Sequence, residues 1–494
     1  MSTYPLLSLA IWIPIFAGLV VLSTGGDRNA PLARMLSLAG AVAGFLITIP
    51  LWTGFDTTNG GMQFVELGSW IPRFNINYHL GVDGISMLFV VLNAFVTIIV
   101  VAAGWEVVKT KVAQYNAAFL IMSGLMNGIF ASLDGVLFYV FFEASLIPLY
   151  LIIGVWGGPN RVYAAFKFFL YTLFGSLLLL LSLMYLFINS GGSFSILEWH
   201  KMPIALGPQI WLFLAFLVAF AVKVPMWPVH TWLPDAHVEA PTGGSIVLAA
   251  IALKLGAYGF IRFSLPILPD ASHELSGLVL GMSLIAVVYI GFVALVQEDM
   301  KKLVAYSSIA HMGFVTLGFF MFSPLAVEGA LVQMVSHGFV AGAMFFCIGV
   351  MYDRVHSRQI ADYGGVVNTM PKFAALFMLF SMANAGLPAT SGFVGEFMVI
   401  LAATKFNFWV AFAAATSLIV GAAYTLWMYK RVVFGDVTNH HVAELTDINK
   451  REFAILGTLA IATLWMGLYP QPFTEVMHAS VNDLLRHVAI SKIQ

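Results

Sequence analysis

Apolar residues occur in long runs along this chain, and short polar connections separate the runs. A membrane-spanning helix needs about 20 predominantly apolar residues, and most of the runs reach that length. Lipid offers no partner for unpaired backbone groups, so such runs are expected to be helical. The pattern predicts an all-α polytopic membrane protein with about 14 transmembrane helices. The predicted spans are 4–22, 32–52, 82–103, 113–131, 135–155, 165–187, 210–228, 243–263, 275–296, 303–322, 327–351, 373–403, 408–429 and 453–469.

Two of the predicted spans contain a helix-breaking segment. Span seven is interrupted at 223–228, which reads Lys-Val-Pro-Met-Trp-Pro, and span twelve at 386–392, which reads Gly-Leu-Pro-Ala-Thr-Ser-Gly. Proline removes a backbone donor and clashes with the preceding turn, so both spans are predicted to be broken helices. Broken helices at matching places in two halves are typical of transporter repeats with an ion path at the break. A unit of five helices is odd, so the second copy is expected to be inverted.

This reading divides the chain into four segments. They are an N-terminal three-helix segment (1–110), a first five-helix repeat (111–265), a second five-helix repeat (274–435), and a last transmembrane helix with a C-terminal tail (450–494). Apolar residues in the tail are spaced as in an amphipathic helix lying on the outer surface or against a neighbour. A frayed polar end is the alternative for the tail.

The sidedness of the chain follows from its basic residues. Lys and Arg are more numerous in the loops that would lie inside if the N-terminus lies outside. Excess positive charge belongs on the cytoplasmic side of a membrane protein. Both termini are therefore expected to face the outer side.

Composition narrows the function classes. Hydrophobic residues make up 60% of the 494 residues and charged residues 10%, against about 25% charged in soluble domains. A net charge of −1 leaves no basic surface for nucleic acid. The single cysteine, Cys347, cannot build a disulfide, metal or iron–sulfur framework. With no Gly-rich nucleotide motif and no haem attachment motif, we expect no cofactor and no metal in this chain.

Four ionisable residues lie well inside the apolar spans: Glu143, Lys223, Lys254 and Glu396. Each such charge costs roughly 2.5 to 3.5 kcal/mol near the middle of a bilayer. Buried salt bridges that hold helices together are one explanation. Because an apolar replacement of a buried pair is often equally stable, a functional role is the favoured explanation.

These residue types suit proton transfer. Burial favours the neutral form of both lysine and glutamate, which lets each take up and release a proton during a cycle. If Glu143 approaches Lys223, the lysine keeps its proton, and if Glu143 moves away, Lys223 becomes a better acid. Lys254 lies on the next span and is expected to couple to Lys223. Glu396, in the other repeat, is expected to be the last acceptor.

Histidines could connect these charges. His311 and His337 lie within spans, and a neutral imidazole both donates and accepts a hydrogen bond, so it can relay a proton. A structural role is nearly as well supported for both. Tyr424 is a weaker candidate for a further link. Asp134 precedes span five and is interpreted as a helix N-terminal acid rather than a proton carrier.

The connection between spans seven and eight is rich in polar side chains. Residues 230–244 hold His230, Asp235, His237 and Glu239 but no Lys or Arg. No close pair of ligands has a familiar His spacing, so a metal site is disfavoured. A structured loop that lines a route for proton uptake is the favoured interpretation.

Together these motifs resemble the antiporter-like membrane subunits of respiratory complex I (NADH:quinone oxidoreductase). The resemblance covers essentially the whole chain. The length, the number of spans and an acid at 396 are most similar to the subunit M and subunit 4 branch of that family. The motifs that carry it are Glu143 with the following Ala-Ser-Leu-Ile-Pro, Lys223 with Pro225 and Pro228, residues 230–244, Lys254 with Gly256, residues 307–313 and residues 386–396.

The resemblance implies a fold of 14 helices with two inverted five-helix repeats and a proton-pumping role in the membrane arm. Glu143 and Lys223 would form the input pair, Lys254 the central relay and Glu396 the exit acid, with His311 and His337 connecting them. NADH, FMN, iron–sulfur clusters and quinone would be bound by partner subunits. Neighbouring antiporter-like subunits would be its partners, and the complex would lie in a bacterial inner membrane. A subunit of a multicomponent sodium/proton antiporter and a passive structural spacer are the alternatives.

Overall fold

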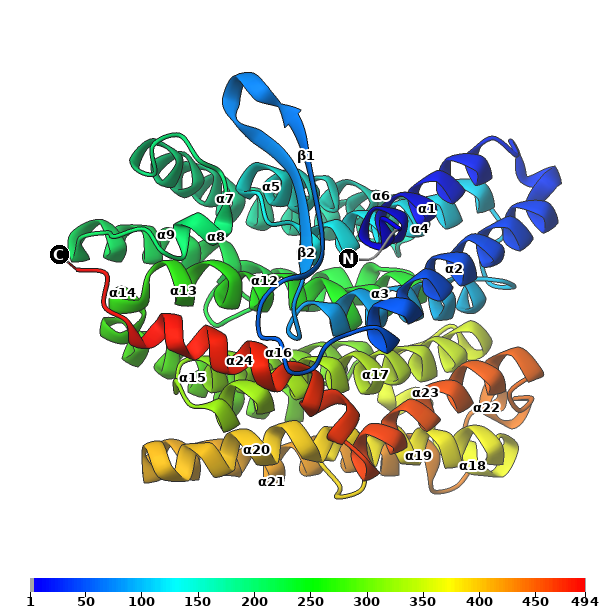
Figure 1. Cartoon of the computed structure of the whole chain (residues 1–494). Helices are drawn as coiled ribbons and strands as arrows, with labels where there is room; N and C mark the ends of the chain where they lie inside the picture. The colour runs from blue at the N-terminus through cyan, green and yellow to red at the C-terminus, as the bar shows by residue number, and fades with distance from the viewer. Residues whose placement is uncertain (1–3, 494) are drawn as a thin grey trace.

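The computed structural model describes residues 4–493, and most of them are helical. Figure 1 shows long helices packed side by side along the chain. The longer helices are α1 (Leu6–Leu22), α2 (Ala30–Thr53), α3 (Met87–Ala103), α4 (Val112–Ala131), α5 (Gly135–Ala144), α6 (Leu146–Trp156), α7 (Arg161–Asn189), α9 (Leu206–Lys223), α15 (Ser276–Leu295), α16 (Met300–Phe319), α17 (Pro324–Val355), α19 (Pro371–Ala385), α20 (Ser391–Phe406), α21 (Phe408–Val433), α23 (Lys450–Leu468) and α24 (Gln471–Ala489). The shorter ones are α8 (Ile196–Trp199), α10 (Trp232–Glu239), α11 (Thr242–Val247), α12 (Leu253–Gly259), α13 (Leu265–Ile267), α14 (Pro269–Glu274), α18 (Val366–Thr369) and α22 (His440–Ala443).

The helical architecture confirms a membrane protein. Within residues 4–493, nine helices are long and apolar enough to cross a membrane. Two further apolar helices, α1 and α3, have 17 residues each. The number of 14 spans stays a prediction.

Both predicted helix breaks are present. Helix α9 ends at Lys223, and the next helix, α10, begins only at Trp232. Helix α19 ends at Ala385 and α20 begins at Ser391. Gly386 ends α19 with a φ of 86°, a left-handed conformation that favours glycine. The local Pro and Gly signals were therefore sufficient to locate both breaks.

The predicted span 243–263 is less regular than a single α-helix. It is built from α11, the π-helical segment η3 (Leu248–Ala252), α12 and a second π-helical segment, η4 (Phe260–Ser264), which α13 follows. Lys254 lies in α12, directly after η3. Because π-helical turns interrupt the regular backbone pairing, they are often found at functional sites.

A β-hairpin is the one element of a different class in the described part of the chain. Strands β1 (Gln63–Ile71) and β2 (Ile76–Val82) pair antiparallel. It was not predicted, and the helix expected to begin at 82 begins at Met87 instead. Residue Asn75 closes the turn with a φ of 53°. The strands contain Gly and polar residues, so they do not form the continuous apolar run by which the spans were recognised.

The C-terminal tail forms the predicted amphipathic helix. Helix α24 buries its apolar side, and a frayed end is wrong for Gln471–Ala489. The backbone amide of Gly84 donates to the Ser480 hydroxyl at 2.8 Å, so α24 packs beside the end of the hairpin. Figure 1 shows α24, in red, running across the bundle near the base of the hairpin. The buried side chains of α24 include Phe473, Val476, Met477, Val481, Leu484 and Val488.

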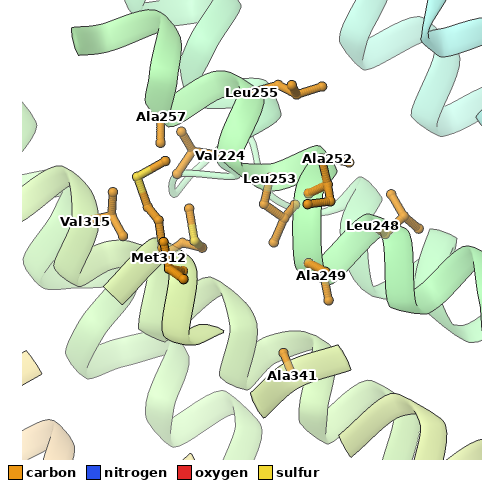
Figure 2. Close-up of a cluster of buried hydrophobic side chains, with 14 of the residues drawn as sticks. Val224, Leu248, Ala249, Ala252, Leu253, Leu255, Ala257, Met312, Val315 and Ala341 are labelled. Carbon is orange, nitrogen blue, oxygen red and sulfur yellow. The ribbon is translucent and has the colours of Figure 1, made fainter. Parts of the chain in front are cut away.

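The hydrophobic core lies between the two halves of the chain. Figure 2 shows Val224, Leu253, Met312 and Ala341 gathered from the α9 break, α12, α16 and α17. Helix α17 lies entirely inside the protein within its most apolar 18 residues. Three of the four candidate charged residues, Lys223, Lys254 and Glu396, are buried, whereas Glu143 is partly exposed.

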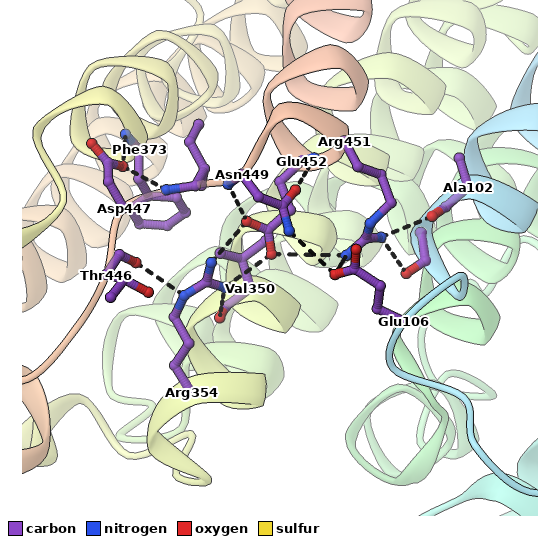
Figure 3. A network of polar contacts seen from close by, with 12 residues as sticks. Ala102, Glu106, Val350, Arg354, Phe373, Thr446, Asp447, Asn449, Arg451 and Glu452 are labelled. Atoms are coloured by element: carbon purple, nitrogen blue, oxygen red, sulfur yellow. Dashed lines mark hydrogen bonds and ion pairs between the residues drawn. The ribbon is translucent and has the colours of Figure 1, made fainter.

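A polar cluster anchors one end of α17. Arg354 donates to both carboxylate oxygens of Glu452, at 2.9 and 2.8 Å. Arg451 pairs with Glu106 at 3.3 Å and donates to the carbonyls of Ala102 and Ala103. Figure 3 shows this cluster joining α17, the start of α23 and the end of α3. It ties the N-terminal helices to the second half of the chain.

Candidate functional site

Lys254 is the most enclosed of the predicted charged residues. Its side chain is fully buried. The ammonium group donates to the carbonyl of Ala249, within the π-helical segment η3, and lies 2.6 Å from Nδ1 of His337. The π-helical turn thus presents a carbonyl to the ammonium group, and α17 presents an imidazole. Lys254 is in direct contact with a group that can receive its proton.

His337 and His311 lie next to each other in the core. Their ring centroids are 6.0 Å apart, with an interplanar angle of 50°. His337 comes from α17 and His311 from α16. The Nε2 atoms of both rings are buried and have no hydrogen-bond partner in the described part of the chain. Each imidazole therefore has one ring nitrogen that is free to take part in a transfer to or from the other ring.

His311 is paired with Glu396. Its Nδ1 atom lies against the Glu396 Oε1 atom in a short contact. Glu396 comes from α20, just after the second helix break, and is 3% exposed. The amide nitrogen of Gln333 donates to the same Oε1 atom at 2.9 Å. Glu396 is therefore held from α16 and from α17 at once.

Four of the predicted residues thus form one chain of neighbours: Lys254, His337, His311 and Glu396. We call this chain the buried relay. It runs through α12, α17, α16 and α20, so it crosses from the first half of the protein to the second. The sequence analysis named these four residues and expected the two histidines to connect the charges, but it did not order the histidines.

The input pair, Glu143 and Lys223, has a different geometry. The ammonium group of Lys223 lies 4.4 Å from the centre of the Phe142 ring. Glu143 interacts with Ser176 and with Lys223, but its Oε1 atom has no hydrogen-bond partner in the part of the chain that the structure describes. No ion pair within 4.0 Å joins the two side chains in residues 4–493. The structure brings the pair near each other without direct contact.

The helices that carry Lys223 and Lys254 approach closely. A methyl group at Gly256 would lie 2.7 Å from the Lys223 Cβ atom and 2.7 Å from the Phe220 carbonyl oxygen. A glycine at 256 is therefore required for α9 and α12 to pack at this distance. This close packing is the structural junction between the input pair and the buried relay.

His237 is a candidate residue to which the sequence analysis assigned no separate role. It lies in α10, is fully buried, and stacks on Phe345 with ring centroids 4.3 Å apart. Both of its ring nitrogens are buried without a hydrogen-bond partner among residues 4–493. It interacts electrostatically with Lys301 and Lys254. The only sequence signal was its place in the polar connection 230–244.

A polar cavity lies beside this connection. Its volume is about 200 Å³, and Glu239, Lys301, Asp353 and Arg358 contribute charged side chains to its lining. Lys301 donates to the carbonyl of Ala240. Lys301, in the lining of this cavity, and Lys254, in the buried relay, are both close enough to act electrostatically on His237. The connection 230–244 is a structured element, and much of it forms α10.

The secondary candidates have clear positions. Tyr424 shares a hydrogen bond of 3.0 Å with Ser307, and Asn384 donates to Ser307 at 3.1 Å. Tyr424 is therefore connected to α16 through Ser307, one turn from His311.

Asp134 caps α5 by accepting from the amides of Val136 and Leu137, which confirms its interpretation as a helix N-terminal acid.

A metal-ligand geometry occurs elsewhere in the chain. In residues 4–493, the candidate group of three ligands is His440, His441 and Glu444, all exposed. None of them belongs to the connection 230–244. The metal alternative therefore gains no support at His230 and His237.

Known proteins share this architecture over the whole chain. The family described as NADH:quinone oxidoreductase/Mrp antiporter, TM matches residues 132–421. NADH-quinone oxidoreductase subunit M of Rhodobacter capsulatus is 49% identical, covering 98% of this chain and 96% of that protein. NADH-ubiquinone oxidoreductase chain 4 of Marchantia polymorpha is 44% identical over 98% of both chains.

Solved structures agree with the sequence relatives. A chain of respiratory complex I from Thermus thermophilus with bound NADH superposes with a TM-score of 0.90 at 31% identity, covering 98% of this chain and 99% of that one. A chain of the Mrp complex from Dietzia sp. DQ12-45-1b has the same fold, with a TM-score of 0.84 at 20% identity over 99% and 100% of the two chains. The chain belongs to the NADH:quinone oxidoreductase/Mrp antiporter membrane family, in the group of NADH-quinone oxidoreductase subunit M and its chain 4 counterparts.

Proposed function

We propose that this protein is a proton-translocating membrane-arm subunit of NADH:quinone oxidoreductase. The observation that carries the proposal is the buried relay, in which two contacting pairs, Lys254 with His337 and His311 with Glu396, meet at adjacent imidazoles. A charged side chain within a membrane span lowers stability, so such residues usually have a function. Here the function would be proton transfer along the series of donors and acceptors in the buried relay.

The relay residues can pass a proton from Lys254 to Glu396 in three steps. The Lys254 ammonium group donates to Nδ1 of His337, and the imidazole then releases a proton from its other nitrogen. His311 would receive a proton on its unpartnered Nε2 atom and deliver a proton from Nδ1 to Glu396. Each transfer is between positioned groups, which is the geometry that proton-transfer catalysis needs.

Protons would reach Lys254 from the polar cavity by way of His237. The cavity is lined by both acidic and basic side chains, and His237 feels the charges of both Lys301 and Lys254. Glu143 and Lys223 would control the relay. Lys223 binds its proton more tightly when Glu143 approaches and releases it more readily when Glu143 withdraws.

The finer organisation is part of the proposal. We infer 14 spans in two inverted five-helix repeats, at 111–265 and 274–435, flanked by segments 1–110 and 450–494. The two observed helix breaks, one in each proposed repeat, support this division. Both termini would face the outer side of a bacterial inner membrane, as the distribution of Lys and Arg indicates.

Redox chemistry would take place in partner subunits. We propose that this chain has no redox centre and is a non-redox subunit of the translocase. NADH, FMN, iron–sulfur clusters and quinone would bind elsewhere in the complex. The relative in Rhodobacter capsulatus carries the name of an NADH-quinone oxidoreductase subunit, which supports partners from such a complex. We further propose that neighbouring antiporter-like subunits are among these partners.

The test is made in assembled complexes in membrane vesicles. We expect Glu143→Gln and Lys223→Ala to abolish proton pumping and most coupled NADH oxidation. The matched controls Glu198→Gln and Lys109→Ala change exposed residues of the same types and should pump normally. Near-normal pumping by both Glu143→Gln and Lys223→Ala would sink the proposal.

Two alternatives give distinct results in the same preparation. A subunit of a multicomponent sodium/proton antiporter would show sodium flux and copurify without flavin or iron–sulfur proteins. The likeness to the Mrp chain shows the shared fold alone. A passive spacer would leave transport intact when Glu143, Lys223, Lys254 and Glu396 are all neutralised.

A further inference from the structure

A buried glutamine contacts the last acid of the relay. Gln333 lies on α17, one turn before His337, so both side chains are on the same face of that helix. It is 2% exposed. Its amide nitrogen donates to Oε1 of Glu396 at 2.9 Å, the same oxygen that contacts His311. Gln333 is thus the second side chain, after His311, that contacts the Glu396 carboxyl group.

The other half of the Gln333 amide is unused. Its Oε1 atom is buried and has no hydrogen-bond partner among the described residues. An unsatisfied buried acceptor is costly, about 1 to 3 kcal/mol, and therefore calls for an explanation. A primary amide carries a donor on one side and an acceptor on the other. The structure uses only the donor, which is the half of the amide from which a carboxylate oxygen can accept a hydrogen bond.

The unused acceptor matches the other protonation state. A protonated carboxyl group has an O–H that must donate. If the Gln333 amide turns about its last torsion, its Oε1 atom faces Glu396 and can accept that hydrogen bond. No bond within Gln333 is made or broken. The proton moves from His311 Nδ1 to the Glu396 carboxylate, and the new O–H then points at Gln333.

The backbone around Gln333 is held firmly enough for such a role. A methyl group at Gly395 would lie 2.6 Å from the backbone nitrogen of Gln333, so α17 and α20 are in close contact there. A second hydrogen bond between the same helices joins the hydroxyls of Ser336 and Ser391 at 2.9 Å. The helices are thus tied independently of the Gln333 side chain.

We propose that Gln333 is a positioning residue that binds Glu396 in both protonation states, donating to the carboxylate and accepting from the protonated acid. By holding the O–H of the protonated acid toward its own amide oxygen, it disfavours return of the proton to His311. This inference rests on the proposed function. It gives the Gln333 amide a role of its own, although Gln333 does not carry a proton.

The experiment compares three variants in assembled complexes. Gln333→Met keeps the size and shape of the side chain and removes both polar groups. Ser336→Ala removes the other hydrogen bond between α17 and α20 without touching Glu396. Glu396→Gln identifies the infrared band of the protonated carboxyl group, since that band is lost in this variant. Pumping per NADH and the redox-induced infrared difference spectrum are measured for each.

We expect Gln333→Met to lower pumping roughly tenfold, the effect of losing one hydrogen bond to a charged group. The carbonyl band of Glu396 should move to higher frequency, because the acid loses its acceptor. Ser336→Ala should pump normally and leave the band in place. The two effects together are expected only if the amide acts on the carboxyl group itself.

Three results would contradict the account in distinguishable ways. Normal pumping by Glu396→Gln would overturn the proposed function. If Glu396→Gln does not pump but Gln333→Met pumps normally, only the role of Gln333 is wrong. If Ser336→Ala loses as much pumping as Gln333→Met and the band does not move, Gln333 is a tie between helices and the inference is overturned.

Discussion

The input pair and the buried relay both contain lysine and glutamate, but side chains touch in the relay and do not touch in the input pair. In the buried relay, Lys254 touches His337, and His311 touches Glu396. In the input pair, Glu143 is only half-buried, and Lys223 faces an aromatic ring rather than a carboxylate oxygen. The difference indicates that the relay is preassembled, whereas the input pair must move to make contact. Control of proton transfer would then lie at the input pair.

Breaking the preassembled region should give the largest effect. His337→Leu removes the acceptor of the Lys254 proton and the link to His311. We expect pumping to fall by about 1000-fold, within the range for a positioned proton-transfer group. Vesicle acidification driven by NADH measures this. His441→Leu, an exposed histidine, is the control, and similar pumping by the two variants would show that the relay is not used.

Loosening the anchor of α17 tests whether the relay depends on a rigid helix. Arg354→Met removes the two-pronged partner of the buried Glu452 carboxylate. It leaves that carboxylate a 4.0 Å contact with Arg451 and the Asn449 backbone amide, which should cost about 3 kcal/mol. Less assembled complex should be recovered, as blue-native electrophoresis would show. Arg486→Met breaks an exposed pair with Asp483 and should cost no more than about 1 kcal/mol. Equal recovery of both variants would contradict a structural role for the Arg354 cluster.

The junction between the two regions can be altered without changing any charge. In Gly256→Ala the new methyl group meets backbone atoms of Phe220 and Val224, so α9 and α12 must separate at a cost of about 2 kcal/mol. Pumping should fall while Lys223 and Lys254 are both retained. Gly281→Ala, where a methyl group meets no atom within 4 Å, is the control. Unchanged pumping in Gly256→Ala would mean that close contact of these helices is unnecessary.

The smallest effect is expected at the start of the helix that carries Glu143. Asp134→Ala removes the cap of α5 and should lower the free energy of unfolding by about 1 kcal/mol. Thermal unfolding of the purified complex measures it. Pumping should stay close to normal because Asp134 carries no proton in this account. A loss of pumping as large as that of Glu143→Gln would give Asp134 a transport role.

Local signals accounted for much of the fold. Runs of apolar residues identified the membrane helices, and Pro225, Pro228 and Gly386 located the breaks, because these residues act on the backbone at their own position. The β-hairpin at 63–82 escaped prediction because its strands mix Gly, polar and apolar residues. The π-helical segments around Lys254 left no recognisable pattern in composition.

The sequence identified only those site residues that are charged and lie within an apolar run. Glu396 and Lys254 were found because a charge within an apolar run is conspicuous. His237 and Gln333 were not assigned roles, since their importance depends on which helices pack together and which way each side chain points. The lack of direct contact between Glu143 and Lys223 depends on the same rotational detail, which no local pattern contains.

The central claim is that protons cross this protein through Lys254. The most direct test is the number of protons pumped per NADH oxidised in proteoliposomes that contain the complex with Lys254→Met. Met preserves the length of the side chain and removes its proton. The account predicts an assembled complex whose residual NADH oxidation is accompanied by a clearly lower proton yield. A full wild-type ratio of protons to NADH would contradict it.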